Sequence, residues 1–152
     1  MIHEIDANLL EYPLDGIVHQ ANCMMVFGSG IALQIKNKYP EAYKADLQHG
    51  RVGDITRLGS FSTVKAHDGK QIYSLYGQYT FGIEKRQTNY EAVYKGLLSI
   101  AKHATENNLS TLGCPKLMGC DRGGASWRIV RAIIEDIFIV SPIDFYICEF
   151  KG

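Results

Sequence analysis

The sequence predicts an α/β fold, because strand-like apolar runs alternate with amphipathic helical segments along most of its 152 residues. No internal repeat, low-complexity tract or linker interrupts this alternation. The length lies within the usual range of one domain, so we expect a single domain over residues 1–152. A strand followed by a glycine-rich loop and a helix occurs twice, as in the ligand sites of open α/β sheets.

The first two strands are predicted at residues 2–5 and 16–22. In the second strand Ile17, Val18 and Ala21 make the apolar positions nearly continuous. Such a strand is typical of a sheet that is covered on both faces. We therefore expect residues 16–22 to lie in the middle of the sheet.

The segment after Gly30 has a helical pattern up to Pro40, where a second helix begins with proline in its favourable first turn. Residues 57–66 and 70–77 then alternate apolar and polar positions on either side of the turn Asp68–Gly69. An Asp-Gly pair between two such runs predicts a β-hairpin, so the sheet should contain some antiparallel pairing.

The strongest helical pattern covers residues 88–107, where Thr88 and Glu91 have the spacing of a capping box. Its apolar stripe is expected to face the sheet and consists of Val93, Leu97, Ile100, Ala101 and Ala104. A fifth strand is predicted at residues 110–117, and the last strand at 143–150. Between them lies a helix with Ser126 as its N-cap, whose core-facing residues are Val130, Ile133, Ile134 and Ile137.

The charges of the chain are balanced, with 16 basic and 16 acidic side chains and no run of like charges. This excludes the electrostatic footprint expected for duplex nucleic acid, so recognition of an anion must be local. No apolar run approaches the roughly 20 residues that cross a bilayer. The N-terminal segment MIHEIDANLLEYP also lacks a basic region before an apolar core. We expect a cytoplasmic protein without a membrane partner.

The four cysteines lie far apart and lack paired metal-ligand spacing. Cys114 and Cys148 fall in apolar, strand-like segments where a small hydrophobic side chain fits. In a cytoplasmic protein this pattern favours buried, reduced thiols over disulfides or a zinc site.

Two glycine-rich loops indicate the function. Residues 27–32, FGSGIA, open a helix after a strand that carries His19 and Asn22. Residues 117–125, LMGCDRGGA, follow another strand and precede Ser126. Backbone N–H groups at helix starts bind phosphates, so two such loops at neighbouring strand ends predict a clamp for one diphosphate. Each loop alone is equally typical of an ordinary tight turn.

A dinucleotide-dependent oxidoreductase is an alternative from another class of protein. Its fingerprint is incomplete, because the segment Gly28–Gly30 lacks the third glycine at the required spacing. No acidic residue ends a second strand about twenty residues further on.

With these loops the sequence resembles the macrodomain family of ADP-ribose-binding proteins. The resemblance covers nearly the whole chain and rests on Asn22, the first glycine loop, PKLMGCDRGGASW and the order of strands and helices. The segments IVHQANC, GSGIALQI, KYPEAYK and QTNYEA are most similar to the yeast-type ADP-ribose-1″-phosphate phosphatases and their small phage and bacterial relatives. The resemblance implies a three-layer α/β/α fold around a mixed sheet of about six strands.

The resemblance implies that Ala7, Asn8 and Leu9 contact adenine. The family commonly has aspartate where Asn8 stands. Because an amide donates as well as accepts hydrogen bonds, adenine binding would survive this exchange with altered hydrogen bonds. The alternative is that Asn8 only shapes a turn after the first strand.

The resemblance further implies that Asn22 contacts the distal ribose. The first loop would surround the diphosphate and this ribose through Phe27, Gly28, Ser29, Gly30, Ile31 and Ala32. The second loop would form the other phosphate clamp through Gly119, Cys120, Asp121, Arg122, Gly123 and Gly124. The spacing from Pro115 to Trp127 is one residue longer than is usual in the family, and Ser126 replaces an acidic residue often found there.

Two residues are candidates for catalysing phosphate removal. The yeast-type phosphatases carry a functional histidine at the position of His19 and an acidic residue after a Phe-Gly pair, which resembles Glu84 after Phe81–Gly82. Histidine transfers protons near neutral pH, and a carboxylate acts as nucleophile or base. His19 lies three positions before Asn22, so a bend or bulge must turn both toward one ligand. The alternatives are a core histidine and a surface Glu84–Lys85 pair.

Asp121 supports a competing chemistry. Some macrodomains that remove ADP-ribose from protein carboxylates use an aspartate in the second loop with a lysine at the end of the fourth strand. Gln78 stands near that lysine position, which disfavours a covalent lysyl mechanism unless Lys85 takes its place. The alternative is that Asp121 and Arg122 pair at the rim of the pocket.

We therefore expect a macrodomain that binds ADP-ribose derivatives and dephosphorylates ADP-ribose 1″-phosphate, without a cofactor or metal. The alternatives are a hydrolase that removes mono-ADP-ribose from protein or nucleic acid, and a non-catalytic ADP-ribose reader. Its partners would be ADP-ribose, ADP-ribose 1″-phosphate or ADP-ribosylated macromolecules.

Overall fold

A computed structural model describes all 152 residues. Six strands of the chain form one mixed sheet. The strands lie in the order β1 (Ile2–Asp6), β6 (Asp144–Glu149), β5 (Thr111–Pro115), β2 (Gly16–Asn22), β4 (Gln71–Gln78) and β3 (Phe61–Lys65). All neighbouring strands run parallel except β3 and β4, which form the predicted hairpin. The mixed sheet expected from the sequence is confirmed.

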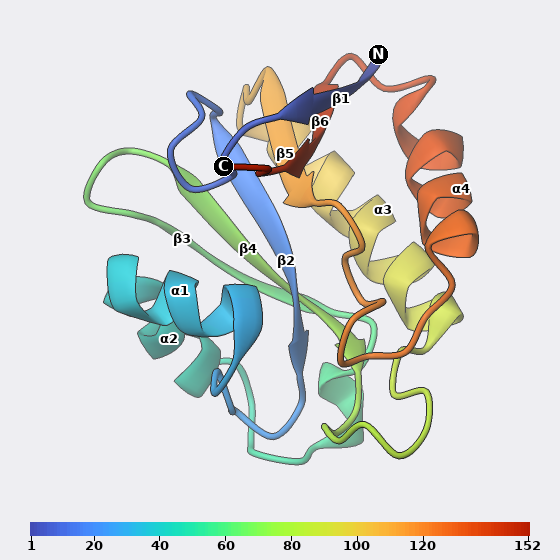
Figure 1. Ribbon diagram of the computed structural model, residues 1–152. Helices are drawn as coiled ribbons and strands as arrows, with labels where there is room; N and C mark the ends of the chain where they lie inside the picture. The colour runs from blue at the N-terminus through green and yellow to red at the C-terminus, as the bar shows by residue number, and fades with distance from the viewer.

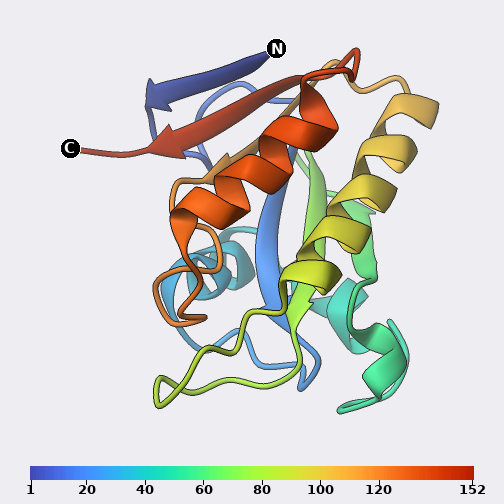
Figure 2. The same ribbon diagram turned by 90° about the vertical axis from the view of Figure 1, so that its right-hand side faces the viewer.

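Helices cover both faces of this sheet, as Figures 1 and 2 show. One face carries α1 (Gly30–Lys38) and α2 (Pro40–Leu47), and the other carries α3 (Tyr90–Glu106) and α4 (Trp127–Phe138). Each interface has its own apolar core. The three-layer α/β/α fold is therefore confirmed. None of the helices combines the length and the apolar character that crossing a membrane demands.

The start of α3 differs from the predicted capping box. The N-cap is Asn89, whose side-chain oxygen accepts a hydrogen bond from the N–H of Ala92 at 3.0 Å. Thr88 instead forms an isolated bridge with Gln78 and directs its hydroxyl to Gly119. The capping role assigned to Thr88 is wrong, because this residue is held outside the helix by its pairing with the end of β4.

The start of α4 agrees with the prediction in position. Ser126 is its N-cap residue, although its side chain makes no capping hydrogen bond.

Cys114 and Cys148 are buried in the core, as expected for small apolar side chains.

The middle of the sheet opens toward one edge. Strands β2 and β5 pair only at Gly16–Leu112 and Ile17–Gly113 and then diverge. β2 remains paired with β4 up to Asn22, with an irregularity between Ala21 and Asn22. Divergence of neighbouring strands at their carboxyl ends leaves a crevice where open α/β sheets bind ligands.

Candidate functional site

A cleft of about 930 Å³ lies at the carboxyl ends of β2, β4 and β5. In Figure 1 β2 and β4 end in the lower part of the molecule, and the loop after β5 descends toward them. Its volume is suited to a small molecule, since ligand pockets measure roughly 300–1,000 Å³. Most residues predicted to bind the ligand line it, namely Asn22, Gly28, Ser29, Gly30, Ile31, Ala32, Gly119, Cys120, Asp121, Arg122 and Gly123. The two glycine loops therefore face one cavity.

The first loop presents unpaired backbone donors. The N–H groups of Gly28 and Ser29, which line the cleft, donate to no atom of the protein. Phe27, also predicted to surround the ligand, is instead buried in the core and does not line the cleft. Gly30 begins α1 with a φ of 58°, a conformation that glycine adopts without strain. The first turn of α1 has no preceding turn to accept its N–H groups. These donors and the positive end of the helix dipole favour a bound anion.

The second loop has a similar backbone character. Gly119 and Gly124 have φ values of 78° and 69°, and Leu117 has the positive φ of 66° that is unusual for a branched side chain. The N–H of Cys120 donates to Leu117 within the loop at 2.8 Å, so it is not free for a ligand. The N–H groups of Gly119 and of residues 121–124 have no protein acceptor. Gly124, although predicted to bind the ligand, does not line the cleft, so the second set of anion donors there consists of Gly119 and residues 121–123.

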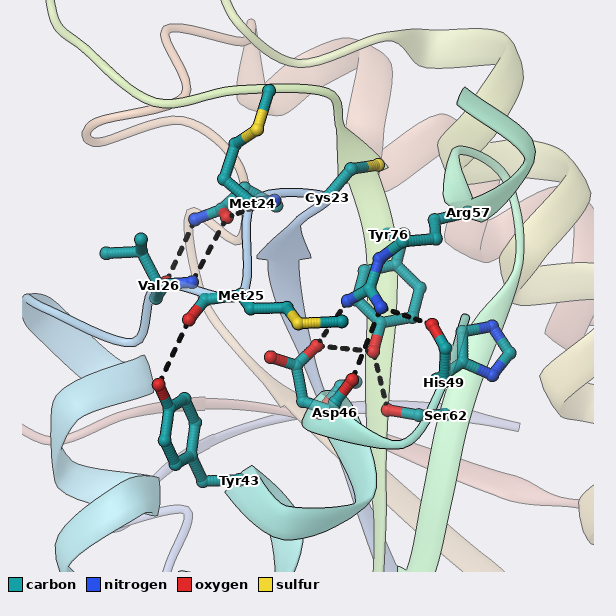
Figure 3. Close-up of polar contacts among 12 residues, drawn as sticks. Cys23, Met24, Met25, Val26, Tyr43, Asp46, His49, Arg57, Ser62 and Tyr76 are labelled. Carbon is teal, nitrogen blue, oxygen red and sulfur yellow. Dashed lines mark hydrogen bonds and ion pairs between the residues drawn. The ribbon is translucent and has the colours of Figure 1, made fainter. Parts of the chain in front are cut away.

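Asn22 shapes the turn that leads into the first loop. The residues of this turn, Cys23 to Val26, are labelled in Figure 3. Its amide nitrogen donates to the carbonyl of Val26 at 2.9 Å, and its oxygen accepts from the N–H of Met24 at 2.9 Å. Met25, at a φ of 61°, is held by Tyr43, whose hydroxyl donates to its carbonyl at 3.1 Å. Asn22 thus fixes the loop and also lines the cleft, while its predicted contact with ribose stays a prediction.

A buried ion pair lies beside this turn (Figure 3). Arg57 ends the short 3₁₀ helix η1 (Ile55–Arg57), and its guanidinium meets the carboxylate of Asp46 at 2.7 Å. The hydroxyl of Tyr76 donates to the same carboxylate oxygen at 2.6 Å. The adjoining loop reaches the turn directly, because the N–H of Gly53 donates to the carbonyl of Cys23 at 2.8 Å. The ion pair therefore stabilises the segment that supports the first glycine loop.

Two glutamines form part of the floor of the cleft. Neither was predicted from the sequence to bind the ligand. Gln20 and Gln78 line the cleft, and the amide nitrogen of Gln20 donates to the side-chain oxygen of Gln78 at 2.7 Å. The sequence did contain a signal for Gln20, because it is a polar residue in an apolar strand, two positions before Asn22.

The segment predicted to contact adenine does not line this cleft. Ala7, Asn8 and Leu9 follow β1, at the same edge of the sheet but separated from β5 by β6. The side-chain oxygen of Asn8 accepts from the N–H of Leu10 at 3.0 Å. The backbone carbonyl of Asn8 accepts from backbone N–H groups of the turn that follows. Asn8 therefore shapes a turn, and its contact with adenine stays a prediction.

His19 lies away from the cleft despite the irregularity at the end of β2. Its ring is fully buried, stands edge-on to Phe27 and contacts the hydroxyl of Ser74 at 2.8 Å. Burial lowers the pKa of His19 from 6.5 to about 4, although the backbone of Gln20, as an acceptor for the ring N–H, opposes this shift. His19 is therefore a neutral core residue that does not line the cleft. Its proposed role in proton transfer stays a prediction.

The remaining candidates lie on exposed loops. Glu84 is exposed and does not line the cleft, whereas Phe81 of the same loop does. Asp121 and Arg122 both line the cleft and form no ion pair with each other. Of the predicted catalytic groups, the structure therefore brings only Asp121 to the cavity, and it does not bring His19 and Glu84 together there.

Comparisons with known proteins agree with this geometry. The chain is 29% identical over 131 residues to the ADP-ribose glycohydrolase OARD1 of Bos taurus, covering 85% of the chain and 78% of that protein. It is 26% identical over 136 residues to a DNA ADP-ribosyl glycohydrolase of Thermus aquaticus, covering 90% of the chain but 37% of that protein. The macrodomain of Mycobacterium tuberculosis DarG superposes with a TM-score of 0.83 at 26% identity, covering 97% of each chain.

These relatives are named as glycohydrolases, so they do not support the closer resemblance to the phosphatase branch. The family itself is shown by the match of the Macro domain model to residues 18–134, a segment that includes both glycine loops and the floor of the cleft. The chain belongs to the macrodomain family.

Proposed function

We propose that this chain binds ADP-ribose in the cleft and removes mono-ADP-ribose from a macromolecule. The observation that carries the proposal is the convergence of both glycine loops on one cavity. Unpaired N–H groups from two sides suit the two phosphates of a diphosphate. The cations Lys116 and Arg122 at the same cleft add favourable charge.

The choice of glycoside hydrolysis over phosphate removal rests on two supports. The relatives described above are named as an ADP-ribose glycohydrolase and a DNA ADP-ribosyl glycohydrolase. The residues expected to serve a phosphatase, His19 and Glu84, do not line the cleft. Glycoside hydrolysis forms a bond from a water oxygen to C1″, breaks the bond to the acceptor and delivers a proton to the leaving atom.

Asp121 is the only carboxylate among the residues that line the cleft. It is our candidate for the base that takes a proton from the attacking water. Gln78 carries no amine at the position of the lysine described above, so we assign the attack to water rather than to a lysine at that position.

A product assay tests this proposal. The purified protein is incubated with a mono-ADP-ribosylated oligonucleotide, a mono-ADP-ribosylated protein and ADP-ribose 1″-phosphate, and the products are identified by mass spectrometry. We expect free ADP-ribose from at least one conjugate. Phosphate released from ADP-ribose 1″-phosphate, with both conjugates intact, would restore the phosphatase interpretation. Tight ADP-ribose binding without any product would identify a reader.

Two variants assign the catalytic group. Asp121→Asn should lower the release of ADP-ribose by about a hundredfold while ADP-ribose still binds, because the base is lost but the loop donors remain. Glu84→Gln is the matched control and should leave the rate unchanged, since Glu84 lies outside the cleft. A full rate in Asp121→Asn, or a large loss in Glu84→Gln, would contradict the assignment.

A further inference from the structure

The second glycine loop is held by hydrogen bonds to one buried residue, Thr88. The hydroxyl of Thr88 donates to the carbonyl of Gly119 at 2.8 Å, and its N–H donates to the carbonyl of Gly123 at 3.0 Å. Gln87 donates its N–H to the same Gly123 carbonyl at 2.9 Å. Both ends of the segment from Gly119 to Gly123 are therefore fastened to the residues before α3.

This closure is tight. A Cβ atom built on Gly123 would lie 2.4 Å from the Thr88 hydroxyl and 2.5 Å from the Gly119 carbonyl oxygen, closer than real Cβ atoms approach. Thr88 is only 2% exposed, so water does not replace its hydrogen bonds. The loop conformation thus depends on a hydroxyl that lies beneath it rather than on the loop residues alone.

Gln20 connects this hydroxyl to the cleft floor. Its amide nitrogen donates to the Thr88 hydroxyl at 2.8 Å and to the side-chain oxygen of Gln78 at 2.7 Å. Since the Thr88 hydroxyl accepts from Gln20, its own proton is directed to Gly119. A continuous series of hydrogen bonds therefore runs from β2 through Thr88 to the second loop.

We propose that Thr88 is a positioning residue, which holds the second glycine loop in its ligand-binding conformation from the floor defined by Gln20. This inference rests on the proposed binding of ADP-ribose, because the loop N–H groups are the groups being positioned. Thr88 does not line the cleft, so it acts through Gly119 and Gly123 rather than by touching the ligand.

The test is the affinity for ADP-ribose, measured by calorimetry, of Thr88→Val and Thr88→Ser. Valine keeps the shape and loses both hydroxyl hydrogen bonds, so binding should weaken about tenfold. Serine keeps the hydroxyl and should restore most of the affinity. Equal affinity in wild type and Thr88→Val would overturn the inference, as would a failure of Thr88→Ser to rescue. Absence of binding by the wild type would instead reject the proposed function.

The chain offers a matched control for lost stability. The Thr63 hydroxyl on β3 accepts from the Gln71 amide nitrogen at 2.8 Å and donates to the Ile72 carbonyl at 2.9 Å, the same two kinds of bond that Thr88 makes. Thr63 is more exposed than Thr88, so Thr63→Val should lower the urea midpoint less than Thr88→Val does, and should leave ADP-ribose affinity unchanged. A comparable loss of affinity in Thr63→Val would show that the effect in Thr88→Val is only structural.

A measurement on the wild type keeps the inference testable if Thr88→Val does not fold. In the free protein the amide protons of Gln87 and Thr88, both bonded to Gly123, should exchange as slowly as that of Val93, which donates to the carbonyl of Asn89 at the start of α3. Fast exchange at both amides would mean that the loop is not fastened there, and would overturn the proposal.

Discussion

His19 illustrates how burial decides the chemistry of a single residue. Its side chain lies in the core between Phe27 and Ser74, so the charged imidazolium would lose its hydration. The same burial that keeps the ring neutral in the folded protein makes it a source of acid sensitivity.

The pH dependence of folding should reveal this residue. The unfolded chain binds a proton at His19 near pH 6.5, whereas the folded protein does so only at about 4, so acid favours the unfolded state across this interval. Between pH 7 and 5 the residue should remove about 2 kcal/mol of the free energy of unfolding. Urea titrations should show a smaller loss for His19→Gln, and an identical pH dependence in both proteins would contradict a buried neutral ring.

The residues of the site were predictable to different degrees. Asn22 and the two glycine loops carry local motifs, so their place at the cleft could be read from the sequence. Gln20 and Thr88 are 68 positions apart, and nothing local to either residue indicates that they meet. The contact of Thr88 with the second loop was not predicted, because the spacing of Thr88 and Glu91 is that of a capping box, which already explains both residue types.

At the scale of elements, one ion pair joins the segments beside the first loop. Arg57 of η1 reaches Asp46 of α2 and lies over the ring of Tyr76, with its central carbon 4.5 Å from the ring centre. Its guanidinium also donates to the carbonyl of His49. Burial raises the pKa of Asp46 despite the opposing effects of Tyr76 and Arg57, so this carboxylate depends strongly on its partners.

Arg57→Met should therefore destabilise the protein by about 3–5 kcal/mol, because it leaves a buried carboxylate without its counter-charge. The double variant Asp46→Leu/Arg57→Met removes both charges and should cost less than the single change. Urea unfolding of the two single variants and the double variant measures this coupling. Additive losses would contradict a direct interaction in the core.

The elements themselves were largely predictable from periodicity. β2 spans Gly16–Asn22 as predicted, because a strand buried on both faces has few polar interruptions. The hairpin was predicted too long at its start, since residues 57–60 were assigned to the strand. Arg57 instead ends a 3₁₀ helix and is buried by its ion pair, a tertiary interaction that alternation of apolar residues does not reveal.

For the whole molecule, the order of the strands decides where the site forms. The sequence predicts which segments are strands, but the separation of β2 from β5 beyond Ile17 depends on contacts between distant parts of the chain. That separation creates room for the two loops to face each other. The fold therefore makes the cleft from a gap in the sheet rather than from a dedicated insertion.

The pairing of β1 with β6 also determines how the molecule resists tension. The two strands are parallel, with Ile2 beside Phe145 and Asp6 beside Glu149, so pulling on Met1 and Gly152 slides one strand along the other and loads all the bonds of the ladder together. A handle at Ser141 in place of Gly152 would instead open the ladder one bond at a time. Single-molecule stretching should give a higher rupture force for the first geometry, and equal forces would show that another part of the sheet yields first.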